Sequence, residues 1–177
     1  LNNKVRKILR YKYELGLADW QPQSPEGVYQ DLRSNQTQML IHDLYQSAMT
    51  VVKNDEGILP IADRQNAYTS VAFGLQDQNA YHRILDNYAQ FDHITIPEGR
   101  APSSGLLRNI PDSNTVLVSY HGLSNSVRGN FGLKPETVQF IEKLKSRGNK
   151  VVAVVFGNPY SLYHFRHADA VICAYQD

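Results

Sequence analysis

Apolar and β-branched residues recur in five short runs from about residue 70 onward, with helical patterns between them. The run Val151–Phe156 is apolar at every position, which suits a parallel strand covered by helices on both faces. Gly157-Asn158-Pro159 then ends it. The pattern predicts strands at Ser70–Phe73, His93–Ile96, Thr115–Tyr120, Lys150–Phe156 and Ala170–Ala174.

The best-specified helix between these strands covers Pro135–Lys145. Proline occupies its first position, three apolar residues share one face, and Gly148 follows its end. Further helices are expected at Ala80–Tyr88, Ser103–Arg108 and Ser161–Phe165. Alternating strands and helices form right-handed βαβ units. The sequence therefore predicts an α/β fold, a three-layer α/β/α sandwich with a mostly parallel sheet of about five strands.

The first third of the chain has a different pattern. It predicts a helix over Leu1–Leu17, a loop or linker over residues 18–23, a helix start at Ser24-Pro25-Glu26, a longer helix over residues 35–49 and a brief strand at Thr50–Lys53. We therefore expect a helical segment and linker over residues 1–23 and an α/β domain over residues 24–177.

Composition excludes several classes of protein. The 18 basic and 17 acidic residues are spread along the 177-residue chain, which argues against a nucleic-acid-binding patch. The one local excess of basic residues alternates with apolar residues at helical spacing, as on the solvated face of an amphipathic helix. No apolar run approaches the ~20 residues that span a membrane. Cys173, the single cysteine, excludes an internal disulfide. The compartment stays open, a periplasmic or secreted location being one option for a bacterial protein.

Candidate chemistry lies in the loops that follow the strands, because open parallel sheets bind ligands at the carboxyl ends of their strands. The loops begin at Gly74, Pro97, His121, Gly157 and Tyr175. The loop after Tyr120 is the most polar, and its candidates for contact with a substrate are His121, Ser124, Asn125 and Arg128. The competing interpretation is a hydrophilic surface loop.

Other groups of reactive residues lack the neighbouring sequence that their chemistry requires. Ser119 and His121 share a strand face but lack a nucleophile elbow. His164 and His167 have metal-ligand spacing without a third ligand, so no metal site is predicted. Gly129–Gly132 follows no strand, so no phosphate loop and no cofactor are predicted. The strand-end carboxylates are Asp77, Glu98 and Asp177, and nothing singles out any of them. The residues alone give no catalytic set.

Several segments in order resemble glycoside hydrolase family 3, from the end of its barrel domain into its second, α/β sandwich domain. Val5–Leu17 is similar to the segment that leaves the barrel. Ala48-Met49-Thr50-Val51-Val52-Lys53-Asn54, followed by Leu59-Pro60, is similar to the entry into the second domain. Val154–Tyr160 and Asp169–Tyr175 are similar to its late strands. The resemblance spans nearly the whole chain.

The resemblance implies an enzyme that hydrolyses β-linked sugars with retention, through a covalent intermediate on an aspartate of the barrel domain. The β-glucosidase branch takes its general acid from a second-domain glutamate, in a loop resembling Glu-Gly-x-Asp-Arg. Here the corresponding segment, Asn125–Phe131, has no carboxylate. The N-acetylglucosaminidase branch takes its acid from a His/Asp pair on the barrel. The resemblance therefore favours an inactive companion domain in that branch, with the barrel domain and a carbohydrate substrate as partners.

Two alternatives stay open. One is a stand-alone α/β module that binds a small ligand in the same crevice, and the other is a β-glucosidase-type domain with a displaced acid. The family's second domain continues through another helix and a last strand beyond the Ala-Tyr strand. On this basis we expect the domain to be truncated at Asp177 or closed differently.

Overall fold

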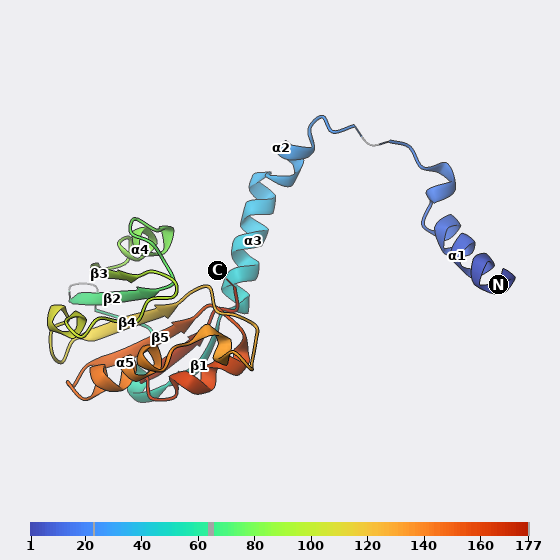
Figure 1. The fold of residues 1–177 in the computed structure, drawn as a ribbon. Helices are drawn as coiled ribbons and strands as arrows, with labels where there is room; N and C mark the ends of the chain where they lie inside the picture. The colour runs from blue at the N-terminus through green and yellow to red at the C-terminus, as the bar shows by residue number, and fades with distance from the viewer. Residues whose placement is uncertain (23, 64–65, 177) are drawn as a thin grey trace. The chain divides into compact units, whose positions relative to one another are not determined.

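The computed structural model describes residues 1–22, 24–63 and 66–176 (Figure 1). The chain forms two compact units, residues 1–44 and 45–177. The first is helical, with α1 (Asn2–Glu14), the 3-10 turn η1 (Leu17–Asp19), α2 (Val28–Leu32) and most of α3 (Asn35–Ala48). The helices expected at residues 1–17 and 35–49 are confirmed within a few residues. The boundary expected between residues 23 and 24 stays a prediction, and Gln23 lies outside the described residues.

The helix start expected at Ser24-Pro25 is wrong. The Ser24 hydroxyl accepts a hydrogen bond from the Glu26 amide at 3.2 Å, so it organises a turn and does not cap the helix. The helix α2 begins three residues later, at Val28, after Gly27 with φ of 82°. A serine favours local turns as readily as helix caps, and the sequence signal does not separate the two.

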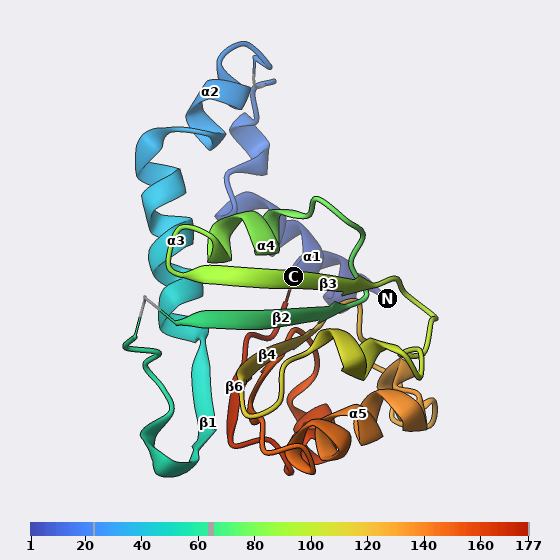
Figure 2. The same ribbon diagram turned by 90° about the vertical axis from the view of Figure 1, so that its left-hand side faces the viewer.

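The second unit contains one six-stranded sheet with the order β1-β6-β5-β4-β2-β3. Its strands are β1 (Thr50–Asn54), β2 (Ala67–Phe73), β3 (Gln90–Ile96), β4 (Thr115–Tyr120), β5 (Lys150–Val155) and β6 (Ala170–Cys173). Strands β2 to β6 pair in parallel, and β1 pairs antiparallel with β6. Figure 2 shows β3 beside β2, with α4 (Ala80–Leu85) alongside. The predicted α/β/α sandwich with a mostly parallel sheet is confirmed.

The predicted helix type is wrong for two segments. The segments expected at Ser103–Arg108 and Ser161–Phe165 are the 3-10 helices η3 (Leu106–Asn109) and η5 (Pro159–Phe165), and α4 ends at Leu85, before the expected Tyr88. Further 3-10 turns are η2 (Asp55–Gly57) and η4 (Asn130–Gly132). These 3-10 helices are four and seven residues long, and periodicity over so few residues does not distinguish 3-10 winding from an α-helix.

The alternation of side chains along the strands divides the core between the two faces of the sheet. On one face, Val118 and Tyr120 of β4 belong to a cluster that includes Phe140 and Leu144 of α5 (Pro135–Lys145). On the other face, Leu117 lies in a second cluster, formed by Val152, Val154, Ala170 and Ala174 with partly buried residues that include Leu85 of α4. The central strands are therefore covered on both faces, as the unbroken apolar run of β5 requires.

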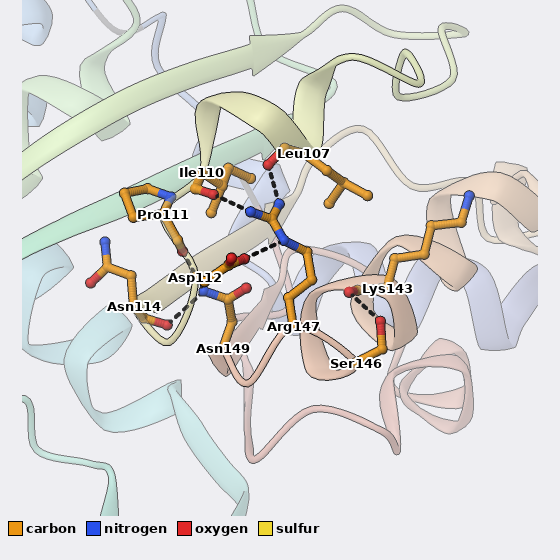
Figure 3. A network of polar contacts seen from close by, with 9 residues as sticks. All are labelled: Leu107, Ile110, Pro111, Asp112, Asn114, Lys143, Ser146, Arg147 and Asn149. Carbon is orange, nitrogen blue, oxygen red and sulfur yellow. Dashed lines mark hydrogen bonds and ion pairs between the residues drawn. The ribbon is translucent and has the colours of Figure 1, made fainter.

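A polar network closes the end of the sheet where β4 and β5 begin (Figure 3). The Arg147 guanidinium donates to the carbonyl oxygens of Leu107 and of Ile110, the latter at 2.8 Å, and pairs with Asp112 at 2.5 Å. The Asn149 side-chain amide donates to the carbonyl oxygen of Pro111 at 2.8 Å. These bonds satisfy the backbone carbonyls where the chain enters β4, so the side chains at this end of the sheet stabilise the fold. The loops available for ligands lie at the opposite end, where the parallel strands terminate.

Candidate functional site

The carboxyl ends of the five parallel strands lie at one edge of the sheet. From β2 the chain crosses to β3 on one side and then to β4 on the other, because β2 lies between β3 and β4. The loops after β2 and β4 therefore leave the sheet in opposite directions, and this switch point is where ligands bind in doubly wound sheets. The candidate loop beginning at His121 starts at this point.

A cleft of about 210 Å³, the switch-point cleft, lies between the ends of β2 and β4. Its polar lining comes from Glu98, Arg100, His121, Ser124, Lys134 and Thr137. The Lys134 ammonium donates a hydrogen bond to the Gly99 carbonyl, linking the loop after β3 to the start of α5. The lining thus combines one acidic side chain with two basic ones.

His121 directly follows the last residue of β4 and is buried, with 7% of its surface exposed. Its backbone amide donates to the Phe73 carbonyl at 2.9 Å, continuing the pairing of β4 with β2. Its ring stacks on Phe156, with centroids 4.3 Å apart, and meets Tyr81 edge-on at 5.2 Å. Burial raises the pKa of Tyr81 to about 12, and the neighbouring Ser119 hydroxyl opposes this shift. His121 is therefore held in one orientation by aromatic packing.

The other three sequence candidates separate along the loop. Ser124 lines the switch-point cleft with His121, and its hydroxyl accepts from the Ser126 amide at 3.1 Å. Asn125 lines a neighbouring, larger cleft. Arg128 is exposed and lines neither cleft. The structure therefore brings together His121 and Ser124, with Asn125 beside them, and leaves Arg128 on the outer part of the loop.

The larger cleft, of about 640 Å³, lies at the ends of β4, β5 and β6. Its side chains come from the loops after these strands and from the end of α3, and they include Tyr45, Asn125, Phe156, Asn158, Tyr175 and Gln176. Sequence reasoning placed loops at Gly157 and Tyr175 but did not join them to Tyr45. No local signal could do so, because Tyr45 reaches this edge only through the fold.

A third polar group lies between α4 and the sheet, and the sequence analysis missed it. The ring of His82 stacks on that of His93 at 4.1 Å, and His93 Nε2 contacts Asp86 Oδ1 at 2.8 Å. Asn79 caps α4 by accepting from the His82 amide at 2.8 Å. Burial, and then the neighbouring His93, lowers the pKa of His82 to about 4. His82 is thus held neutral against the sheet.

The remaining sequence candidates have local partners. Asp77 accepts a hydrogen bond from the Thr95 hydroxyl, and His167 contacts Glu142 at 3.4 Å. Within residues 1–22, 24–63 and 66–176, no three His, Cys, Asp or Glu side chains are grouped to hold a metal ion. No helix in those ranges is both long and apolar enough to cross a membrane. Asp177, the third strand-end carboxylate, lies outside the described residues.

Comparison with known proteins finds similarity in structure alone. No family model matches the chain, and no curated protein matches its sequence. Among solved structures, a glycoside hydrolase family 3 β-N-acetylglucosaminidase from Paenibacillus sp. str. FPU-7 superposes with a TM-score of 0.67 and 13% identity over 99% of this chain. A β-glucosidase from Listeria innocua gives a TM-score of 0.67 and 13% identity over 94% of the chain. A fungal multi-domain GH3 β-N-acetylglucosaminidase gives 0.59 and 20% over 81%.

These similarities establish the fold. They also show what share of each enzyme's length this chain matches. The chain covers 34% of the Paenibacillus enzyme, 27% of the Listeria enzyme and 16% of the fungal one. It therefore spans about a third or less of the enzymes whose fold it shares. Both β-glucosidases and β-N-acetylglucosaminidases are among these structural neighbours, so the fold does not distinguish the two branches.

Proposed function

We propose that this chain is the companion domain of a retaining family 3 glycoside hydrolase that cleaves β-linked N-acetylglucosaminides. A barrel domain of the same polypeptide would supply the catalytic aspartate. The observation that carries the proposal is the loop after β4, which lies at the switch point but contains no carboxylate between His121 and Phe131. A general acid from this loop is therefore lacking. The matching fold of family 3 enzymes, a β-N-acetylglucosaminidase and a β-glucosidase among them, supports the companion-domain assignment, whereas the choice of branch rests on the loop.

In this proposal the domain supports the barrel and lines one side of the sugar site with its strand-end loops. His121 and Ser124 supply hydrogen-bonding groups in the switch-point cleft, Asn125 extends from the same loop, and Arg128 lies at its outer part. The buried and stacked ring of His121 gives the loop a fixed base. Contact of Arg128 with substrate would then depend on the loop's outer part facing the barrel.

One observation favours a second candidate, a β-glucosidase-type domain with a displaced acid. Glu98, from the loop after β3, lines the switch-point cleft beside His121. A carboxyl group at that position is a candidate for the acid that protonates the leaving group. The two candidates therefore differ in whether Glu98 takes part in the chemistry.

The decisive experiment measures hydrolysis of p-nitrophenyl N-acetyl-β-glucosaminide and of p-nitrophenyl β-glucoside by the full polypeptide and by residues 1–177 alone. We expect the full polypeptide to cleave the amino sugar, with kcat unchanged in Glu98→Gln, and the isolated chain to cleave neither substrate. Arg128→Ala should raise KM. A preference for the β-glucoside together with loss of kcat in Glu98→Gln would overturn the proposal in favour of the second candidate.

A further inference from the structure

We infer that the cap of α4, formed by Asn79 and His82, is a pH-sensitive switch. Protonation of His82 breaks the cap, releases this short helix from the sheet and removes a ring that packs against His121. All of these residues lie within the second compact unit, residues 45–177. The switch rests on the proposed function only for its effect on the sugar site, where His121 is a candidate.

The side-chain amide of Asn79 has one orientation, because both of its ends are bonded. Its oxygen accepts from the His82 backbone amide at 2.8 Å and thereby caps α4. Its nitrogen donates to the Gln76 carbonyl at 2.8 Å and lies 3.2 Å from His82 Nδ1. An amide nitrogen donates and does not accept, so Nδ1 is the acceptor in this contact. The neutral His82 ring therefore carries its proton on Nε2.

Protonation of His82 sets two donors against each other. A proton on Nδ1 would point at the Asn79 nitrogen, so a hydrogen bond would be replaced by a repulsive contact. Turning the Asn79 amide over would offer its oxygen to Nδ1, but the His82 backbone amide would then lose its acceptor. With His82 charged, the Asn79 side chain cannot satisfy both groups, and the cap of α4 is weakened.

The helix α4 depends on this cap because it is short. It has six residues, and helices of this length are marginal by themselves. At its other end, Asp86 contacts His93 Nε2 of β3 at 2.8 Å, and Leu85 packs on the second cluster of the sheet. A few side chains therefore hold α4 on the sheet, and loss of the cap favours its opening.

The groups that face His82 determine how readily it takes up a proton. Burial has the largest effect and lowers the pKa of His82 to about 4. The imidazoles of His93, stacked at 4.1 Å, and of His121 act in the same direction, whereas the carboxylates of Asp86 and Asp77 act against it. Opening of α4 exposes the His82 ring and returns its pKa toward the ordinary value. Acid therefore favours the open helix.

Tyr81 connects α4 to the loop at the switch point. It precedes His82 in the helix, and its ring meets His121 edge-on at 5.2 Å and Phe156 at 5.9 Å. When α4 opens, Tyr81 leaves this position, and His121 loses the ring that packs against it from the helix. Protonation of His82 would therefore release the orientation of His121 and weaken its contact with a substrate.

The test is NMR hydrogen exchange of isotopically labelled residues 1–177 as a function of pH. With a pKa of 6.5 for His82 in the open helix and about 4 in the closed one, the opening equilibrium at the His82 and Asp86 amides should rise about 20-fold from pH ~7 to pH ~5. These amides should exchange faster than that of Leu144 in α5 at every pH, as a local opening requires. The ring-to-ring cross-relaxation between Tyr81 and His121 should weaken as His82 titrates.

The substitution Asn79→Asp separates the charge of His82 from the loss of the cap. A carboxylate accepts from the His82 backbone amide and from a protonated Nδ1 together, so α4 stays capped when His82 is charged. The opening of α4 should then show no rise in acid, and His82→Gln, which does not titrate, should show none either. Asn158→Asp is the matched control, because Asn158 caps η5 by accepting from the Tyr160 amide at 3.0 Å. It should keep the rise seen in the parent.

The outcomes separate the switch from the proposed function. The parent's rise persisting in Asn79→Asp or in His82→Gln would overturn the switch and leave the glycosidase assignment standing. Equal exchange at the α4 amides and at Leu144 would also overturn it, because the helix would then open only with the whole fold. An acid-dependent opening of α4, together with cleavage of the β-glucoside alone by the full polypeptide, would support the switch and contradict the N-acetylglucosaminidase assignment.

Discussion

Asn54 and Leu59 are joined by two reciprocal hydrogen bonds. The Asn54 side-chain nitrogen donates to the Leu59 carbonyl at 2.8 Å, and the Leu59 amide donates to the Asn54 side-chain oxygen at 2.9 Å. The neighbouring Lys53 ammonium donates to the carbonyl oxygens of Ala168 at 2.6 Å and of Arg166 at 2.9 Å. Both carbonyls lie in the segment that leads into β6. Asn54 therefore closes the turn that follows β1, and Lys53 joins β1 to the segment that precedes β6. Both residues belong to the Lys-Asn and Leu-Pro segments that resemble the family.

Removing the Asn54 amide should destabilise the second unit. We expect Asn54→Ala to lower the free energy of unfolding by about 1–2 kcal/mol, because it removes both bonds that close the turn. Asn54→Asp keeps the acceptor for the Leu59 amide and should lose less. Urea unfolding followed by circular dichroism measures both variants, and an unchanged midpoint in Asn54→Ala would show that the turn closes without its side chain.

Gly74 should tolerate no side chain. Its φ is 90°, and a Cβ atom there would lie 2.4 Å from the His121 carbonyl oxygen. We expect Gly74→Ala to destabilise the fold by about 1–3 kcal/mol and to shift the NMR signals of His121. Gly99→Ala is the matched control, since Gly99 has φ of 73° with nothing within 4 Å of a Cβ atom. It should cost only about 1 kcal/mol. Equal losses in the two variants would contradict a close approach at His121.

Arg147 should contribute to stability without affecting the ligand edge. Its guanidinium holds the segment entering β4 through Leu107, Ile110 and Asp112. Arg147→Ala should lower the free energy of unfolding by about 2 kcal/mol, and Arg147→Lys, which lacks the planar fork, should recover only part of it. The NMR signals of Gly157 and Tyr175, at the opposite end of the sheet, should keep their positions in both variants. Shifted signals there in a variant that remains folded would mean that the two ends of the sheet are coupled.

Stability should depend on the charge of His82. Its folded-state pKa of about 4 lies below the ordinary value of 6.5, so the neutral form is favoured in the fold. The corresponding stability is fully present above pH ~6.5 and is lost as the pH falls from there toward about 4. Urea unfolding at pH ~7 and ~5 should show this loss, and His82→Gln should reduce it.

Strong local patterns allowed several elements to be predicted to the residue. The strand β4 (Thr115–Tyr120) and the helix α5 (Pro135–Lys145) have the predicted bounds, because a buried parallel strand must be apolar throughout and a helix led by proline has a fixed start. The type of helix at Ser103–Arg108 and Ser161–Phe165 was not predicted correctly, because so few residues do not show the difference between α and 3-10 winding.

Local sequence patterns were enough to predict the α/β class, the elements around β4, β5 and α5, and the end of the sheet where the loops gather, because burial on two faces requires unbroken apolar runs. Which loop residues share a cleft depends on the tertiary fold. Tyr45, Phe156 and Tyr175 meet at one cleft, His82 stacks on His93, and Arg128 lies apart from His121. These relationships depend on strand order and on how loops pack at the sheet edge, and neither leaves a periodic trace in the sequence.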